Sequence, residues 1–466
     1  MGRPTPDPSL IQGGENEGRS LNRKEEDGKA GRVTPAPLPR PWRAAAIIGV
    51  IAQLLFSFRL TTPHTLMFDE VHYVPAARTL LKLSGPVNIE HPLLGKELIA
   101  AGIALFGDNS MGWRFFSTLA GTGTVLGIFA MAWLIFGKVR TATLAAIFAL
   151  LNITIFIQAR IGMLDGFMGV FVVLGLAALL WAMRAPAGAT GMRGPWPRWV
   201  LGGVLLGLAV AAKWAAAPII AFACIGFVAV RLSDGRRQKQ SVWAALNGTG
   251  QPHWPGLPVV PALLALGLVS VTTYALTFMP AFFYHSQYLT WGELIGFQGK
   301  MYAQQTQVLP PHPYQSSWWS WPLMIRPIWY LYEQVDGAQR GVLMIGNPAV
   351  LWGGLVAVAA CLRAGLRDGA GKQLAVALLW IGAFGMWALI PKSLGFFYYY
   401  YLPSIFLALP LAGAWEHYGK GRLKNWDEGY VALTAGLFAY FYPIISSLPL
   451  GGAQSFQHWM WFKTWP

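Results

Sequence analysis

Long apolar runs separated by polar connections dominate the chain after residue 40. A run of about 20 residues is long enough to cross a hydrocarbon layer of roughly 30 Å as an α-helix. We count about eleven such runs, which predict an all-α polytopic membrane protein of about 11 transmembrane helices. Their approximate cores are 42–59, 114–136, 141–158, 165–183, 198–212, 214–230, 258–281, 342–361, 373–391, 396–414 and 429–447.

Composition and charge agree with this class. Hydrophobic residues make up 55% of the chain and charged residues only 12%, outside the range of soluble globular proteins. The net charge of +15 does not require nucleic acid, because anionic lipid headgroups are sufficient partners. Cys224 and Cys361 both lie in or beside apolar runs, which argues against a disulfide framework.

The positive residues predict an orientation, since Lys and Arg are retained in cytoplasmic loops during insertion. With the N-terminus in the cytosol, the tail and alternate connections hold 23 of the 35 Lys and Arg residues. An odd number of helices then places the C-terminus outside. Residues 1–40 are polar and rich in Gly and Pro, as in a disordered cytoplasmic tail.

Two long outer connections divide the chain. The segment 60–113 carries five of the nine predicted outer acids, and its stretches "FDEVHYVPAARTLL" and "NIEHPLLGKELIAAGIALFG" mix apolar and charged residues, as interfacial helices do. We therefore predict a tail, a catalytic transmembrane module that includes this loop, an aromatic-rich outer loop and a C-terminal transmembrane module, at 1–40, 41–281, 282–341 and 342–466.

Candidate chemistry gathers at the predicted outer surface. Asp69 and Glu70 are adjacent in "MFDEVHY". Arg114 and Lys213 stand at the outer ends of apolar runs, where an ionisable group is costly and tends to be functional; snorkelling to the headgroups is the alternative for both. Cations that stabilise a departing phosphate, beside a carboxylate that accepts a proton, suit chemistry on a lipid-linked phosphate.

Two further features leave alternatives open. The outer stretch "HPYQSSWWSWPLMIRPIWYLYE" contains Trp319, and such aromatic residues are either interfacial anchors or a binding surface. Asp69, Glu70 and His72 offer ligands for a divalent cation, although one adjacent pair and a nearby His is weak evidence for a metal site.

The motifs "FDEVHY", "EHPLLGK", "RIGMLDGF", "GLAVAAKW" and "WWSWPL" follow one another in this order. Together with the closing "FYYYYLPSIFLALPL", they resemble the protein O-mannosyltransferases, polytopic transferases that use a polyprenyl-phosphate sugar. The resemblance implies a GT-C type glycosyltransferase architecture in a bacterial cell membrane. It implies inverting transfer of mannose from polyprenyl-phosphate-mannose to Ser or Thr hydroxyls of translocated proteins on the outer face, with no cofactor required.

The resemblance also implies roles for particular residues. Asp69 matches the acid regarded as the catalytic base or its orienter, with Glu70 as its partner, and the donor phosphate is assigned to Lys213, Arg114 and Arg160. The other candidates that match family positions or neighbour them are His72, His91, Lys96, Asp165, Trp319 and Tyr400.

Three departures from the family pattern matter. Leu93 replaces the second proline of "HPPLGK". Tyr400 lies where many relatives have His before "YLP", so it is expected to take over a hydrogen bond. The loop 282–341 is too short for the large outer domain of eukaryotic relatives.

Two competing functions remain. Related enzymes transfer aminoarabinose or another sugar to a lipid, so the acceptor can be a glycolipid instead of a protein. A transporter also has many helices, but it should show paired repeats and charges near the bilayer midplane, and the charges here gather at one surface. The sequence carries no signal for an oligomeric state.

Overall fold

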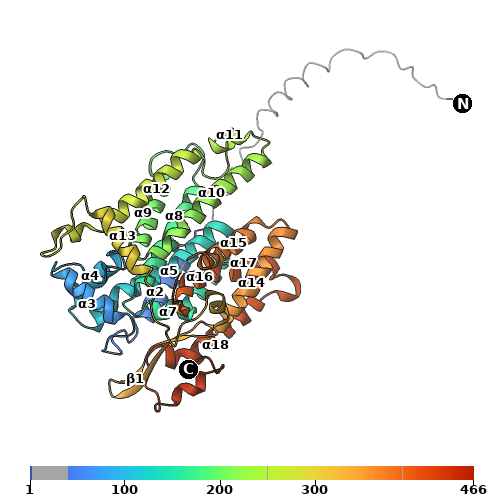
Figure 1. The fold of residues 1–466 in the computed structure, drawn as a ribbon. Coiled ribbons are helices and arrows are strands. Elements are labelled where there is room, and N and C mark those ends of the chain that lie inside the picture. Colours follow the sequence, from blue (N-terminus) through green and yellow to red (C-terminus); the bar gives the residue numbers. More distant parts are fainter. Residues whose placement is uncertain (3–39, 249, 391) are drawn as a thin grey trace. The chain divides into compact units, whose positions relative to one another are not determined.

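Helices form most of the folded chain (Figure 1). The structure is a computed structural model that describes residues 1–2, 40–248, 250–390 and 392–466, so the predicted disordered tail lies almost wholly outside the described residues. Nine predicted spans coincide with single long helices: α2 (Trp42–Ser57), α5 (Ser110–Phe136), α8 (Leu164–Met183), α9 (Pro195–Ala212), α10 (Ala217–Arg237), α12 (Val259–Leu276), α14 (Pro348–Arg367), α15 (Gly371–Gly385) and α18 (Trp426–Ile445).

The other two predicted spans are broken. The run 141–158 divides into α6 (Val139–Leu150) and α7 (Ile153–Gln158) at Asn152, whose side chain accepts a hydrogen bond from the Thr154 N–H. The run 396–414 divides into η7 (Phe397–Tyr400), α16 (Tyr401–Phe406) and α17 (Ala408–Tyr418). The two breaks meet, because Thr154 Oγ1 and Ser404 Oγ are 2.7 Å apart.

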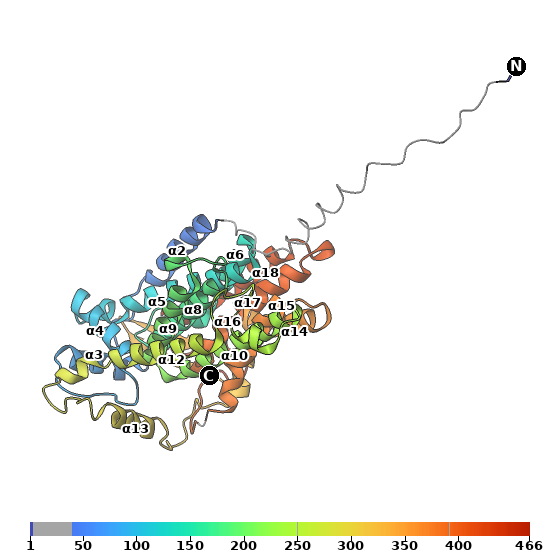
Figure 2. The same ribbon diagram turned by 90° about the horizontal axis from the view of Figure 1, so that it is seen from above.

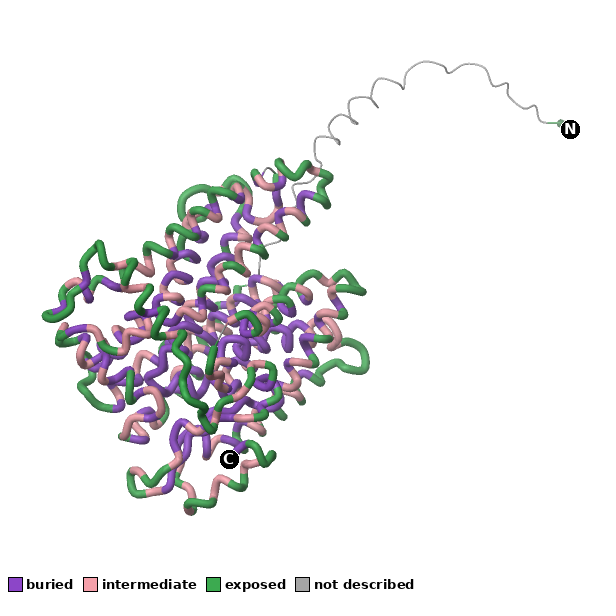
Figure 3. The backbone as a smooth tube through the Cα atoms, viewed as in Figure 1, coloured by how far each residue is buried: buried purple, intermediate pink, exposed green. Residues whose placement is uncertain are grey.

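Membrane-spanning capacity is present, but the predicted number of eleven helices is not confirmed. Among the described residues, seven helical segments are long and apolar enough to cross a membrane, while α2 and α6 are apolar but shorter. The segments that contain α10 and α12 bury the smallest share of their residues, and Leu264 and Leu268 of α12 are exposed. Figure 3 shows exposed residues interspersed with buried ones along the backbone. Apolar side chains on the outside suit contact with lipid, so the chain is a multi-pass membrane protein.

The all-α prediction is wrong between residues 328 and 344. Strands β1 (Ile328–Val335) and β2 (Ala338–Met344) form an antiparallel hairpin with Asp336 and Gly337 at the turn, both at positive φ. Asp-Gly between apolar stretches is a strong hairpin signal that the helical interpretation overlooked. The following helix therefore begins at Pro348 and not near residue 342.

The two helices predicted in the segment 60–113 are confirmed as α3 (Glu70–Leu81) and α4 (Leu94–Phe106). The second long connection contains, besides the hairpin, α13 (Leu294–Gln305) and the 3₁₀ helix η5 (Trp318–Leu323). The remaining short elements are α11 (Val242–Leu246), η2 (Gly191–Arg193), η3 (Trp214–Ala216), η4 (Met279–Phe283), η6 (Met386–Ala388), η8 (Gly421–Leu423) and η9 (Ser455–Trp459).

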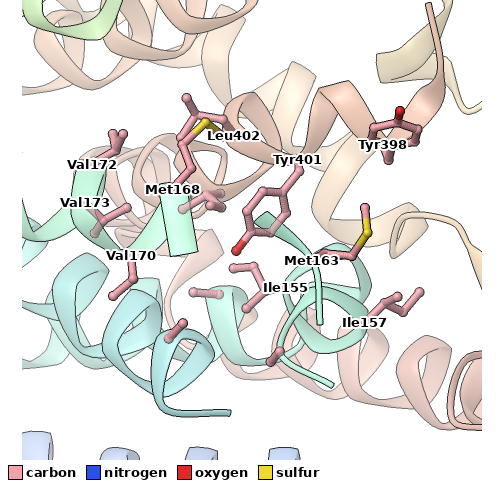
Figure 4. Close-up of a cluster of buried hydrophobic side chains, with 14 of the residues drawn as sticks. Ile155, Ile157, Met163, Met168, Val170, Val172, Val173, Tyr398, Tyr401 and Leu402 are labelled. Carbon is pink, nitrogen blue, oxygen red and sulfur yellow. The ribbon is translucent and has the colours of Figure 1, made fainter. Parts of the chain in front are cut away.

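Buried side chains join the segment 155–169 to the last third of the chain. Figure 4 shows the Tyr401 ring among Ile155, Met163 and Met168, and all four residues are almost fully buried. Gly169 permits this packing, because a Cβ there would lie 2.8 Å from a ring carbon of Tyr401. These two segments, far apart in the sequence, are thus held in one core, which allows both to contribute to one site.

Polar groups gather at the two opposite ends of the helix bundle. Lys138 follows α5 and pairs with Glu416 at 2.7 Å, and Arg140 pairs with Asp427 at 2.5 Å, so connections predicted to be cytosolic contact one another. Arg114 lies at the other end of α5, whose 27 residues span about 40 Å. Helices α8 and α9 lie side by side (Figure 2) and carry Asp165 and Lys213 at that same end.

Candidate active site

A cavity of about 920 Å³ opens between α3, α13, the junction of α9 with η3 and the segment before η7. Its wall combines ionisable and aromatic side chains with an apolar part. The described residues that line it include Asp69, His72, Tyr73, Glu90, His91, Val210, Lys213, Trp214, Ala217, Pro218, Gln305, Leu309, Trp387, Ile390, Lys392, Tyr398 and Tyr399. The sequence-based candidates Asp69, His72, His91 and Lys213 therefore come together at one cavity.

Asp69 stands immediately before α3 but does not cap it. Aspartate at such a position often accepts a hydrogen bond from the helix backbone, whereas the Asp69 carboxylate accepts one from the Tyr73 hydroxyl at 3.3 Å and lines the cavity. Burial raises the pKa of Asp69 to about 6, and the nearby positive charge of Lys213 opposes this rise. At neutral pH the group is thus mostly ionised and suited to accept a proton.

Lys213 is held by a buried ion pair. Its Nζ lies 2.9 Å and 2.8 Å from the two carboxylate oxygens of Asp165. It also lies 5.5 Å and 5.4 Å from the ring centroids of Tyr398 and Tyr399, close enough for cation–π attraction. The α-helix ends just before Lys213, so this side chain points from a break in the backbone into the cavity wall.

Glu70 faces away from the cavity, although it is adjacent to Asp69. Its carboxylate accepts hydrogen bonds at 2.8 Å from Arg114 Nε, Arg114 Nη2 and the N–H groups of Gly162 and Met67. Both side chains of the Glu70–Arg114 pair are 0% exposed. Successive helical side chains diverge by about 100°, which explains why the two acids have different surroundings.

The two arginines predicted to bind phosphate have backbone partners instead. Arg114 Nη1 donates to the carbonyl of Pro63 and Nη2 to that of Thr65, both at 2.7 Å. Arg160 Nη1 donates to Phe56 O at 2.9 Å and Nη2 to Arg59 O at 3.2 Å. Neither arginine is among the described residues that line the cavity. These contacts hold the segment after α2 in place, and phosphate binding by either arginine stays a prediction.

His91 and Lys96 shape the loop between α3 and α4. The Lys96 ammonium donates to the carbonyls of Asn88 at 2.7 Å and His91 at 2.8 Å, and burial lowers the pKa of Lys96 to about 7. Burial and nearby lysines lower the pKa of His91 well below its usual range. The neutral His91 ring lines the cavity, with Nδ1 3.0 Å from Gln305 Nε2.

Trp319 and Tyr400 lie outside the main cavity. Trp319 is 58% exposed and lines a smaller pocket of about 390 Å³ that shares Trp387 and Lys392 with the cavity. Tyr400 is buried and accepts a hydrogen bond from Trp380 Nε1 at 3.2 Å. Its two predecessors in the tyrosine run, Tyr398 and Tyr399, line the cavity instead.

Sequence reasoning missed Lys392, Gln305, Tyr398 and Tyr399 at this cavity. A signal for Lys392 was available, because it is a lone lysine in the apolar stretch "WALIPKSLGFF" at a predicted outer helix end. Metal ligands were considered at Asp69, Glu70 and His72, yet the first two point in different directions. Within the described part of the chain, no three His, Cys, Asp or Glu side chains form a group that can hold a metal ion.

Two family models match the chain. One is described as dolichyl-phosphate-mannose-protein mannosyltransferase and matches residues 90–250. The other is described as the C-terminal four-transmembrane region of protein O-mannosyltransferase and matches residues 290–465. The chain belongs to the protein O-mannosyltransferase family. This confirms the resemblance drawn from the motifs, and the chain is thus a glycosyltransferase.

Relatives of similar length support the membership. A polyprenol-phosphate-mannose--protein mannosyltransferase of Mycobacterium tuberculosis is 28% identical over 91% of this chain and 92% of its own. The protein of the same description from Corynebacterium glutamicum is 24% identical over 94% of this chain and 96% of its own.

Solved structures support the GT-C part of the predicted fold class. The S. cerevisiae Pmt1–Pmt2 protein O-mannosyltransferase complex bound to the sugar donor matches with a TM-score of 0.76 at 14% identity, covering 95% of this chain and 94% of the other. Cupriavidus metallidurans ArnT bound to undecaprenyl phosphate matches with a TM-score of 0.54 at 15% identity, covering 84% of this chain and 63% of the other. This protein O-mannosyltransferase therefore has a GT-C type fold.

Proposed function

We propose that this chain transfers mannose, with inversion, from polyprenyl-phosphate-mannose to Ser or Thr hydroxyls of proteins. The observation that carries the proposal is that Asp69 and Lys213, from distant parts of the sequence, line one cavity. The M. tuberculosis and C. glutamicum relatives carry names that state this donor and a protein acceptor. Family membership alone does not assign these residues; their geometry supports the assignment.

In the proposed reaction, the acceptor oxygen attacks the anomeric carbon from the face opposite the phosphate. The new bond joins the acceptor oxygen to this carbon, the bond between this carbon and the phosphate oxygen breaks, and Asp69 takes the hydroxyl proton. General-base assistance of this kind contributes about 10²- to 10⁴-fold. Lys213 stabilises the negative charge that develops on the departing polyprenyl phosphate, and Asp165 and the tyrosine rings hold it in position.

The apolar part of the cavity wall suits the lipid part of the donor. Val210 lies in the last turn of α9, just before Lys213, and Ala217 and Pro218 begin α10. Leu309 and Ile390 face the same cavity from later segments. A donor whose phosphate lies near Lys213 would therefore have apolar side chains next to its first isoprene units.

We place the site on the outer face of a bacterial cell membrane, with the N-terminus in the cytosol. The support is the separation of the bundle into two ends. The connections after α5 and α17 hold Lys138 and Lys420, as expected of cytosolic loops, whereas Asp165 and Lys213 lie at the other end of their helices.

The test is transfer by membranes that contain the full chain, supplied with radiolabelled polyprenyl-phosphate-mannose. We expect label in protein for the wild type and its loss with Asp69→Asn, a substitution of nearly equal size that removes the base. Label in extractable lipid would instead support a lipid acceptor. Label in neither fraction would favour another donor or a transporter, and full activity of Asp69→Asn would exclude this carboxylate as the base.

A further inference from the structure

Lys392 and Lys213 both lie near the Tyr399 ring. Its Nζ lies 5.9 Å from the Tyr399 ring centroid, and Lys213 Nζ lies 5.4 Å from the same centroid. Both lysines line the cavity, but they come from segments more than a hundred residues apart, before η7 and after α9. Two ammonium groups thus share one wall of the proposed donor site.

The two lysines differ in their charge partners. Lys213 is neutralised by the bidentate Asp165. In the described part of the chain, no carboxylate lies within 4.0 Å of the Lys392 Nζ. The hydrogen bonds of Lys392 go to Gln305 Oε1 at 2.8 Å and Gln305 O at 3.4 Å. Lys392 is thus an ammonium whose hydrogen-bond partners carry no charge, whereas Asp165 and Asp69 act on Lys213.

The surroundings of Lys392 disfavour its charged form. Burial, and to a smaller extent the positive charge of Lys213, lowers the pKa of Lys392 to about 8. An anion bound between the lysines would remove part of this cost, because opposite charge favours the ionised form. The arrangement therefore favours an anion in the cavity over an empty one.

Gln305 orients Lys392 without neutralising it. The Gln305 amide oxygen accepts from Lys392 at 2.8 Å, while its nitrogen donates to Glu90 O at 2.6 Å. The lysine is thus fixed to the loop that also carries His91. An ammonium has three donors, so at least one remains for a ligand after both contacts to Gln305.

We infer that Lys392 supplies the second positive charge for the donor phosphate and acts most strongly on the departing polyprenyl phosphate. This inference rests on the proposed function. A phosphodiester carries one negative charge, whereas a free phosphate monoester carries nearly two. Since Asp165 already neutralises Lys213, the additional charge that develops as the sugar leaves is met by Lys392. A cation that stabilises the transition state more strongly than the bound donor raises kcat.

The test uses the purified full-length chain in detergent with undecaprenyl phosphate as the probe, followed by transfer to an acceptor peptide that contains no acidic residue. We expect Lys392→Gln to weaken binding of the probe about tenfold or more and to lower kcat, since each charge-assisted hydrogen bond is worth about a factor of ten. Lys392→Arg should retain most of both. The control is Lys300→Gln, an exposed lysine of α13 that does not line the cavity.

Several outcomes would overturn the inference. One is Lys392→Gln binding the probe as tightly as the wild type, and another is Lys300→Gln losing as much affinity. In a parallel assay with an acidic acceptor peptide, a change confined to the KM for that peptide would assign the charge to the acceptor. Thermal unfolding of each variant distinguishes weaker binding of the probe from loss of the folded structure. If the wild type binds the probe but transfers no mannose, the proposed function fails while the affinity comparison still decides the role of Lys392.

Discussion

The Phe68 ring stacks on the Tyr330 ring, with centroids 4.2 Å apart and an interplanar angle of 12°. Phe68 directly precedes Asp69 and has a positive φ of 47°, a conformation that is uncommon for a bulky residue. Tyr330 belongs to β1, and its hydroxyl accepts a hydrogen bond from Gln158 Nε2 at 3.1 Å. The hairpin that sequence reasoning overlooked therefore holds the residue next to the proposed base.

We expect Tyr330→Ala to lower kcat about tenfold or more, because loss of the stacked ring frees the backbone that positions Asp69. Tyr330→Phe keeps the stack and loses only the hydroxyl near Gln158, so its activity should stay close to the wild type. The measurement is kcat at saturating donor, with the pH profile as a second readout. If both variants lose activity equally, the hydroxyl and not the stack is what matters.

The pH dependence of transfer should follow the ionisation of Asp69. Its pKa is raised to about 6, and the base must be ionised to act, so kcat/KM should fall as the pH drops below about 6. The Tyr73 hydroxyl donates a hydrogen bond that favours the ionised Asp69 carboxylate. Tyr73→Phe removes this bond and should therefore move the acid limb of the pH profile to higher pH. Tyr288→Phe, an exposed tyrosine away from the cavity, should leave the limb in place. An unchanged limb in Tyr73→Phe would contradict the assignment.

Sequence patterns identified most helices and several residues at the cavity, for physical reasons that also show their limits. Apolar runs reveal burial or lipid contact, and costly charges such as Lys213 stand out against them. The pattern does not fix the rotation of a helix, so the sequence could not show which of Asp69 and Glu70 faces the cavity. The partners of Arg114 were hidden as well, because its carbonyl acceptors carry no side-chain signal.

The Glu70–Arg114 pair is expected to act on stability. Both side chains are 0% exposed, and removing one partner of a buried pair costs about 3–5 kcal/mol because a charge is left without compensation. Glu70→Gln and Arg114→Met should each lower the free energy of unfolding by about this amount, and the double variant should lose less than the sum. Unfolding in denaturant measures the free energy of unfolding of the wild type and of each variant.

The matched control for that pair is Asp108→Asn. Arg78 and Asp108 pair at 2.7 Å, but their side chains are 38% and 45% exposed, so the loss should be about 0–1 kcal/mol. Donor KM distinguishes the two roles of Arg114. If Arg114 bound the phosphate, Arg114→Met would raise donor KM in protein that remains folded, whereas a bracing role predicts that the lost activity follows the lost stability.

Gly169 of α8 should be intolerant of any side chain. A Cβ there would lie 2.8 Å from a ring carbon of Tyr401 and 3.0 Å from Ile405 Cδ1, so Gly169→Ala forces the broken helices of the core apart at a cost of about 1–3 kcal/mol. Gly436→Ala in α18 is the control, because its Cβ would meet nothing within 4 Å. There the gain in helix propensity should stabilise by about 0.5–1 kcal/mol. Thermal unfolding in detergent should therefore shift in opposite directions, and a stabilised Gly169→Ala would refute the close packing of Tyr401 on α8.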